Sequence, residues 1–293
     1  MNEILDLCKG YKRLTYLEPL YELLEPFYHM ELSTPLLCAT PWKMVQEKKS
    51  STAVLAIHGY QGYPGEMTYL GLKLYQANFD VYCVRLPGHG VTKEDFINTN
   101  FEDWLAVARS SLGYLVKEYK DVYVVGHSMG ALIATIIAKE FKIERLALIS
   151  PAFKMRGLSK AKIKILSFFK DELPLPWKSD PSFWGICERE NSDDEILGKA
   201  YWSKIVLSQM FELIKLVEMA KTSLPKMYSK VICVFGSADF SVDSKWIEKY
   251  FKAKVSTPIE FLTIDGASHL CLYSNVKERR DLCNDSIVRS FID

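Results

Sequence analysis

The sequence predicts an α/β fold, in which a mostly parallel, doubly wound sheet is covered by helices on both faces. Short apolar runs rich in Val, Ile and Leu alternate along the chain with segments of helical periodicity. Within the runs apolar residues are nearly continuous, as is typical of parallel strands buried on both faces. The chain has 293 residues, of which 48% are hydrophobic, enough for one main domain with an insertion.

Apolar runs and helical segments follow one another in a regular order. The strands are expected at residues 52–59, 80–86, 121–126, 145–150, 230–236 and 259–265. The helices are expected between them at 66–76, 101–119, 131–141 and 244–252, with a closing helix at 276–292. This alternation of strand and helix favours a doubly wound α/β sheet.

Two regions interrupt this alternation. Residues 1–30 read as a helical extension that Pro19 and Pro26 must divide or kink. Residues 151–225 are too long for a loop and contain their own helical patterns, so we expect an inserted helical cap. The core would then consist of residues 31–150 and 226–293.

Composition narrows the possible functions. Lys and Arg number 37 against 36 Asp and Glu, so nothing indicates a nucleic-acid partner. The first residues lack the apolar core of a signal peptide, and no segment reads as a membrane span. The seven cysteines form no CxxC pair, and Cys83 and Cys233 lie in strand-like runs. Buried reduced thiols and a cytoplasmic location are therefore expected, without a metal site.

The most informative stretch is Gly-His-Ser-Met-Gly at residues 126–130, which matches the pattern G-x-S-x-G. An apolar strand precedes it and a helical segment follows it, which is the context that a nucleophile on a sharp strand-to-helix turn requires. The apex residue of such a turn is strained, and the positions two before and two after it are pressed against backbone. Glycine suits both positions, so Ser128 is predicted to be a nucleophile.

A serine hydroxyl needs a base within hydrogen-bond reach. Of the five histidines, His269 follows the last predicted strand, where reactive groups of a parallel sheet collect. It also follows Ser128 in chain order, so His269 is predicted to be the base. The remaining histidines are less suitable by position; they are His29, His58, His89 and His127.

The base needs a carboxylate to hold its tautomer. Asp239 follows the strand at 230–236 and is the preferred candidate. Its rival Asp243 reads as the N-cap of the helix at 244–252, and Asp265 reads as a turn former before a glycine. For the oxyanion, the backbone N–H groups of Met129, after the nucleophile, and of Tyr60, after the first predicted strand, are the expected donors.

Taken in order, these motifs resemble the α/β-hydrolase superfamily, and within it the monoacylglycerol lipase, lysophospholipase and carboxylesterase group. The matching segments are HGYQGYPGE at 58–66, RLPGHG at 85–90, GHSMG at 126–130, GSAD at 236–239 and GASH at 266–269. The resemblance implies a triad of Ser128, Asp239 and His269, oxyanion donors at Tyr60 and Met129, and no cofactor or metal. It assigns His89 to a structural turn, and it has no counterpart for residues 1–30.

The cap offers two clues to substrate, each with an alternative. Its large aromatic residues could line an acyl pocket or could fill the core of the cap itself. They are Phe153, Phe168, Phe169, Trp177, Phe183, Trp184, Tyr201, Trp202 and Phe211. The basic stretch 154–170 could contact anionic lipid, or could be a solvated face balanced by the acidic run at 190–195.

The sequence thus predicts a cytoplasmic serine hydrolase for a monoacylglycerol, a lysophospholipid or a simple carboxylic ester. The same triad would also suit a thioesterase, an amidase or an acyltransferase, and a ligand-binding homologue without chemistry is a further alternative. Peripheral membrane contact and a homodimer are left open.

Overall fold

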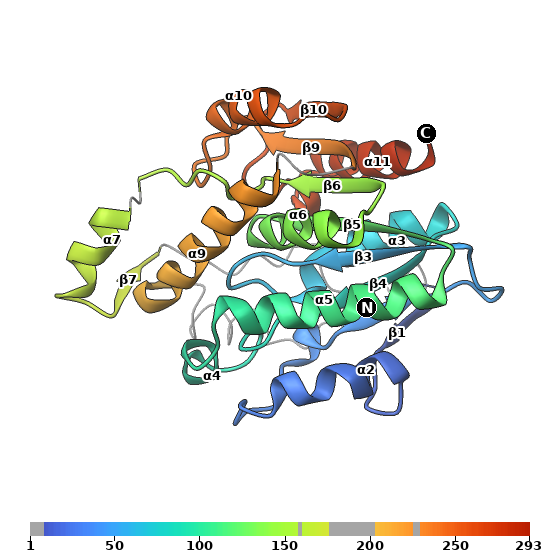
Figure 1. The fold of residues 1–293 in the computed structure, drawn as a ribbon, viewed down its shortest axis with the longest axis horizontal. Coiled ribbons are helices and arrows are strands. Elements are labelled where there is room, and N and C mark those ends of the chain that lie inside the picture. Colours follow the sequence, from blue (N-terminus) through green and yellow to red (C-terminus); the bar gives the residue numbers. More distant parts are fainter. Residues whose placement is uncertain (1–8, 158–159, 176–202, 225–228) are drawn as a thin grey trace.

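A computed structural model of the chain describes residues 9–157, 160–175, 203–224 and 229–293 (Figure 1). Its main feature is one eight-stranded sheet with the order β1-β2-β4-β3-β5-β6-β9-β10. The strands are β1 (Tyr11–Arg13), β2 (Trp42–Met44), β3 (Thr52–Ile57), β4 (Asp80–Val84), β5 (Asp121–His127), β6 (Arg145–Ile149), β9 (Lys230–Gly236) and β10 (Ile259–Ile264). The six strands from β4 to β10 in this order are parallel, so the predicted doubly wound sheet is confirmed.

The sheet has a core on each face because neighbouring residues of a buried strand point in opposite directions. In β3, Leu55 and Ile57 pack in one hydrophobic cluster, while Val54 and Ala56 pack in the other. Helices α5 (Phe101–Glu118) and α6 (Met129–Phe141) contribute to the first cluster. Helices α3 (Thr68–Gln76) and α11 (Lys277–Ile292) contribute to the second, and they lie side by side in Figure 1. The remaining core elements are η2 (Leu37–Ala39), η3 (Pro64–Met67), α4 (Lys93–Ile97), α10 (Ser244–Lys254) and η6 (Cys271–Tyr273).

The N-terminal region differs from the predicted helical extension. Residues Tyr11–Arg13 form β1, an antiparallel edge strand on β2, rather than a helix. Helix α2 (Pro19–Leu24) begins at Pro19, and η1 (Glu25–Tyr28) contains Pro26 at its start, so the two prolines do divide the helical segment. Strands of three residues, such as β1 and β2, are too short to carry a hydrophobic period, which is why the sequence did not reveal them.

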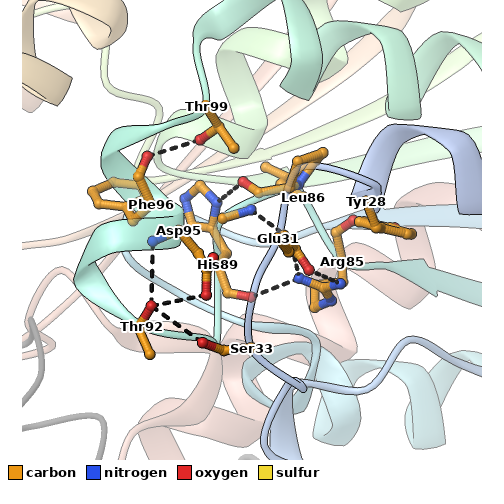
Figure 2. Close-up of polar contacts among 12 residues, drawn as sticks. Tyr28, Glu31, Ser33, Arg85, Leu86, His89, Thr92, Asp95, Phe96 and Thr99 are labelled. Atoms are coloured by element: carbon orange, nitrogen blue, oxygen red, sulfur yellow. Dashed lines mark hydrogen bonds and ion pairs between the residues drawn. The ribbon is translucent and has the colours of Figure 1, made fainter.

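A buried ion pair joins this N-terminal region to the turn after β4 (Figure 2). The Arg85 guanidinium donates to both carboxylate oxygens of Glu31, at 2.7 and 2.8 Å. Glu31 also accepts from the N–H of Gly88 at 2.8 Å, and Arg85 also donates to the carbonyl oxygen of His89 at 3.2 Å. The Tyr28 hydroxyl donates to the carbonyl oxygen of Arg85 at 2.7 Å. The turn at 85–90 is therefore held by residues that lie more than fifty positions earlier in the chain.

The segment after Glu31 continues this attachment to α4. The N–H of Leu32 donates to Asp95 at 2.7 Å. The Thr92 hydroxyl donates to the same carboxylate at 2.8 Å (Figure 2). Thr92 is also the N-cap of α4, since its hydroxyl accepts from the N–H of Asp95.

Within residues 151–225, the segment expected to form a cap, the structure describes two helices and a strand pair. Helix α7 (Lys160–Ser167) packs on α9 (Leu207–Ser223), and the two project together at the left of Figure 1. Strands β7 (Glu172–Pro174) and β8 (Lys204–Val206) form an antiparallel pair that the sequence did not predict. Five of the cap aromatics lie outside the described residues, namely Trp177, Phe183, Trp184, Tyr201 and Trp202, as does the acidic run at 190–195.

Other expectations from composition can be compared with the described residues. Cys83 and Cys233 are buried free thiols, as predicted. Among the helices described, none is both long enough and apolar enough to cross a membrane.

We predict that Glu31→Gln lowers the free energy of unfolding by about 3–5 kcal/mol, because it leaves the guanidinium of Arg85 buried without a carboxylate. The side chains of Arg85 and Glu31 are 2% and 5% exposed. Glu140→Gln is the matched control: Arg109 contacts both oxygens of Glu140, but these side chains are 38% and 29% exposed. Its loss should be about 1 kcal/mol or less. Urea denaturation measures both, and equal losses would contradict the prediction.

Candidate active site

The predicted nucleophile lies at a sharp turn between β5 and α6. Ser128 has φ 53° and ψ −111°, a conformation that residues with a side chain rarely adopt. Its N–H donates to the carbonyl oxygen of Ile149 at 2.8 Å, and its own carbonyl oxygen accepts from the N–H of Ala152 at 3.3 Å. These bonds to the end of β6 hold the strained residue in place.

Both glycines of the motif are required by close backbone packing. A Cβ on Gly126 would lie under 3.0 Å from the backbone of Gly130, and a Cβ on Gly130 would collide with the carbonyl oxygens of Ile57 and His58. The turn is thus pressed against the end of β3, which bears out the steric argument made from the sequence.

Ser128, His269 and Asp239 lie in hydrogen-bonded succession. The Nε2 atom of His269 is 2.9 Å from the Ser128 hydroxyl, and its Nδ1 atom is 2.8 Å from Oδ2 of Asp239. An ionised carboxylate only accepts, so Nδ1 carries the hydrogen and Nε2 accepts from the serine hydroxyl. Three residues separated by up to 141 positions are therefore arranged as a nucleophile, a base and an orienting acid.

Asp239 is fixed on both carboxylate oxygens. Oδ1 accepts from the N–H groups of Ser241 at 2.7 Å and Val242 at 3.1 Å, while Oδ2 accepts from His269. Burial would raise the pKa of Asp239, but the hydrogen bond and charge of His269, together with these two N–H groups, hold that pKa below its usual value. The side chain is 1% exposed, so the carboxylate is kept ionised without water.

The rival carboxylates have other roles, as the sequence suggested. Asp243 is the N-cap of α10 and accepts from the N–H of Trp246 at 3.2 Å. Asp265 accepts from the Ser237 hydroxyl at 3.1 Å and precedes Gly266, which has φ +64°.

The loops that carry the acid and the base are joined directly. The N–H of Ala238 donates to the carbonyl oxygen of Ala267 at 2.9 Å, and Ser237 accepts from the N–H of Gly266 at 2.7 Å. Gly236 lies so close that a Cβ would collide with the carbonyl oxygens of Ala267 and Ser268. This close approach sets the separation of Asp239 and His269.

His127 supports the base from the other side. Its Nε2 donates to the carbonyl oxygen of His269 at 3.1 Å, and the two rings lie 5.2 Å apart between centroids. Burial, followed by the neighbouring charge of His269, lowers the pKa of His127 to about 3, so its ring is neutral at pH 7. This tether is a role that the sequence gave no reason to assign.

His58 and His89 form a buried support beneath the end of β3. His58 Nε2 accepts from the N–H of Leu86 at 3.1 Å, and the two imidazoles lie 5.1 Å apart. His89 packs edge-on against Phe96 and Trp104, so the expectation that it is structural fits its contacts. His29 is exposed in the N-terminal region.

The expected oxyanion donors flank the serine. Met129 is the first residue of α6, where helix geometry leaves the N–H without an intrahelical acceptor. Tyr60 follows Gly59, whose ideal Cβ position is 3.3 Å from Cβ of Ser128, so this backbone lies against the nucleophile. The Tyr60 hydroxyl donates to the carbonyl oxygen of Val206 at 3.2 Å, which fixes the ring beneath the cap.

Glu66 is a buried carboxyl that the sequence analysis did not single out. It is 5% exposed, lies beneath Gly62, and accepts from the backbone N–H groups of Tyr63 and Gly59. Burial raises the pKa of Glu66 to about 8, against the effect of these two donors. Because Gly59 precedes Tyr60, this carboxyl holds the same loop that would supply an oxyanion donor.

The serine and the imidazole open into a cavity of about 410 Å³. Gln61, which the sequence analysis also missed, lines it and donates to the carbonyl oxygen of Lys204 at 3.0 Å. Apolar side chains from the cap and core form most of the remaining wall, namely Ala152, Met155, Leu175, Ile205, Met210, Leu213, Phe240 and Val242. None of the four cap aromatics in the described residues lines it: Phe153 is buried, Phe211 is half-buried, and Phe168 and Phe169 are exposed.

The arrangement can carry out nucleophilic attack on a polarised carbonyl. His269 can take the hydroxyl proton of Ser128, and Asp239 can stabilise the resulting imidazolium. Within the described ranges, no group of three His, Cys, Asp or Glu side chains could hold a metal ion.

The sequence of the chain matches the model of one protein family. The model described as "Serine aminopeptidase, S33" (Hydrolase_4) matches residues 48–275, more than half of the chain. A thermostable monoacylglycerol lipase from Bacillus sp. (strain H-257) is 35% identical over 86 residues, 29% of this chain and 34% of that protein. A carboxylesterase from Bacillus subtilis is 30% identical over 88 residues, 30% of this chain and 36% of that protein. These two matches thus span about a third of each relative.

Solved structures agree with the predicted fold. A structure from work on LipS and LipT, two metagenome-derived lipolytic enzymes, has a TM-score of 0.73 at 21% identity, covering 89% of this chain and 100% of that one. A soluble variant of the monoglyceride lipase from Saccharomyces cerevisiae has a TM-score of 0.64 at 15% identity, covering 89% and 94%. At these identities the similarity establishes the shared α/β-hydrolase fold.

We predict that Gly130→Ala prevents formation of the native turn, because the added Cβ has only backbone to displace. Gly113→Ala is the matched control: Gly113 lies within α5, and its Cβ would be 3.7 Å from the Phe141 ring, an ordinary contact. The control should stabilise the protein by about 0.5–1 kcal/mol. Thermal unfolding followed by circular dichroism compares the two, and a Gly130→Ala variant with the wild-type melting temperature would refute the steric argument.

We predict a distinct pH dependence for the stability contributed by Glu66. Its folded pKa of about 8 lies above the ordinary 4.5, so the folded state binds the extra proton between these values. Stability from this group is complete below pH 4.5 and is lost as pH rises through 8, at about 1.4 kcal/mol per pH unit.

Glu66→Gln should remove this slope, so the variant gains stability relative to wild type between pH 5 and pH 8. The exposed Glu102→Gln should follow the wild-type curve. Urea denaturation at a series of pH values tests this, and parallel curves for wild type and Glu66→Gln would exclude a raised pKa.

Proposed function

The chain belongs to the serine aminopeptidase S33 family, and from this premise we propose that it is a serine hydrolase that cleaves carboxylic esters through an acyl-enzyme on Ser128. The observation that carries the proposal is the hydrogen-bonded succession of Ser128, His269 and Asp239 at the mouth of an apolar cavity. The relatives named as monoacylglycerol lipase and carboxylesterase support an ester as the substrate.

In the proposed first half-reaction, the Ser128 oxygen attacks the ester carbonyl as its proton passes to Nε2 of His269. Asp239 stabilises the imidazolium through Nδ1–H. The tetrahedral oxyanion accepts hydrogen bonds from the N–H groups of Tyr60 and Met129. Collapse breaks the bond to the alcohol oxygen, which takes the proton from His269, and leaves the acyl group on Ser128.

In the second half-reaction, water replaces the alcohol. His269 takes a proton from the water as its oxygen attacks the acyl carbonyl, and the same two N–H groups hold the second oxyanion. Collapse returns the proton to the Ser128 oxygen and releases a carboxylic acid. The net reaction is an ester plus water to an acid plus an alcohol.

The cavity favours an ester over a peptide amino terminus, although the family is named for an aminopeptidase. An aminopeptidase must recognise a positively charged α-amino group, for which a carboxylate is the natural partner. Among the described residues the lining includes no Asp or Glu, and its one permanently charged side chain is Arg156. The apolar wall of Leu175, Ile205, Met210 and Leu213 suits an acyl chain. A monoacylglycerol, a lysophospholipid or a simple carboxylic ester fits these features.

We predict that Ser128→Ala abolishes both labelling by a fluorophosphonate probe and turnover of p-nitrophenyl esters. Asp239→Asn should lower kcat by about 10³–10⁴, because the amide no longer fixes the imidazole tautomer. Asp265→Asn, at an exposed turn, should keep wild-type turnover.

Steady-state kinetics with p-nitrophenyl butyrate provide the measurement. Retention of activity in Ser128→Ala would refute the proposal. Aminoacyl p-nitroanilides and added alcohols, used in parallel, would reveal amide cleavage or acyl transfer instead.

A further inference from the structure

A second cavity adjoins the catalytic one and has a different character. It measures about 750 Å³, and it shares Met155 and Arg156 with the cavity that contains Ser128. Its charged lining consists of the four cations Lys154, Arg156, Lys160 and Lys221 and the two carboxylates Glu218 and Asp243. The chain as a whole carries a net charge of only +1, so this is a local concentration of positive charge.

The two carboxylates in this lining are already engaged. Glu218 lies 3.2 Å from the ammonium group of Lys221, and Asp243 caps α10 by accepting from the N–H of Trp246. The pair with Glu218 also occupies Lys221, so Lys154, Arg156 and Lys160 remain against Asp243, and the lining has a net charge of +2. A cation-lined hollow of this kind attracts an anion through both charge and hydrogen bonding.

Arg156 is held at the boundary between the two cavities by the loop that carries the acid. Its backbone N–H donates to the carbonyl oxygen of Ser241 at 2.9 Å, and its side-chain Nε donates to the carbonyl oxygen of Val242 at 2.8 Å. The preceding residue, Met155, forms a β-bridge with Val242. The guanidinium is therefore fixed in position before any ligand arrives, which reduces the entropy lost on binding.

Within the residues that the structure describes, the Arg156 guanidinium donates only through Nε. In the described part of the chain, its nearest carboxylate oxygen is Oδ1 of Asp243 at 3.9 Å, beyond normal hydrogen-bond length, and the Arg156 side chain is 48% exposed. The planar edge formed by the two Nη groups matches two oxygens of a phosphate, a fork that an ammonium lacks.

The position of Arg156 also indicates which part of an ester it would meet. Val242 and Ser241, which hold Arg156, are the residues whose N–H groups bind Asp239, and Asp239 orients His269. In the proposed reaction His269 must protonate the departing alcohol, so the alcohol lies on this side of the serine. The acyl chain would then occupy the apolar wall formed by Met210 and Leu213.

We propose that Arg156 and the cation-lined cavity bind a phosphate group on the alcohol portion of the ester, so that the preferred substrate is an acyl ester of a phosphorylated alcohol. The inference rests on the proposed function and narrows its substrate class. Neutral monoacylglycerols would bind without this contact.

The test compares three esters with the same hexanoyl chain, used below their micelle-forming concentrations: hexanoyl-glycerol, hexanoyl-glycerol 3-phosphate and hexanoyl-glycerophosphocholine. Wild-type kcat/KM should be at least about tenfold higher for the phosphate monoester than for the neutral ester, the size expected for a hydrogen bond to a charged group. Arg156→Gln should lower that ratio by about tenfold. Lys164→Gln, an exposed α7 position outside both linings, should leave the ratio unchanged.

Inhibition separates a headgroup site from a general phosphate site. If the site recognises the whole phosphorylated alcohol, glycerol 3-phosphate should inhibit the wild type competitively and should inhibit Arg156→Gln only weakly. Inorganic phosphate should inhibit the wild type less than glycerol 3-phosphate does. Equal inhibition by the two would overturn the assignment to a phosphorylated alcohol.

The outcomes also distinguish this inference from the proposed function. Turnover of p-nitrophenyl butyrate and of hexanoyl-glycerol with no preference for the phosphate ester, or a ratio unaffected by Arg156→Gln, would overturn the inference alone. Failure of the wild type to cleave any ester would overturn the proposed function.

Discussion

The strained backbone at Ser128 is the constraint on which the rest of the site depends. A residue with a side chain reaches φ 53° and ψ −111° only when its surroundings leave no alternative. Here the surroundings are main chain: Gly126 and Gly130 allow β5, α6 and the end of β3 to approach within distances that no Cβ would permit. Hydrogen bonds to Ile149 and from Ala152 complete the enclosure. The surrounding backbone therefore holds Ser128, which follows the carboxyl end of β5, in this conformation.

The same principle sets the distance between the acid and the base. Gly236 brings the loop after β9 against the loop after β10, and His127 tethers the carbonyl of His269. The support extends further than the family motifs. The buried pair of Glu31 and Arg85 holds the turn at 85–90 to the N-terminal region. Leu86 in this turn donates to His58, and the next residue, Gly59, lies against Ser128. The N-terminal segment, which the sequence treated as an extension, is thus part of the structure beneath the site.

The sequence predicted the parts of this structure that have local signatures. Six parallel strands carry continuous apolar runs, and Ser128 lies in a strand–turn–helix context that few other chemistries require. Asp239 follows a strand and Asp243 has an N-cap pattern, so the sequence favours Asp239 as the acid. The hydrogen bond of Asp239 to His269 agrees with this prediction. What remained hidden depends on contacts across the chain. Glu31 and Arg85 are 54 positions apart, and Glu66 stands at the start of a predicted helix, where a glutamate is usually solvated. The roles of the Glu31–Arg85 pair and of Glu66 both depend on burial, which no local sequence pattern encodes.

The dominance of main-chain atoms around Ser128 restricts where new specificity can arise. At Gly126 and Gly130, any side chain would collide with backbone atoms, so these two positions offer no variation in shape. Met210 and Leu213 of α9, by contrast, line the cavity with side chains and take no part in the hydrogen bonds of the triad. Natural or directed evolution toward a different ester would therefore accumulate substitutions at positions such as Met210 and Leu213. The glycines around Ser128 would stay unchanged.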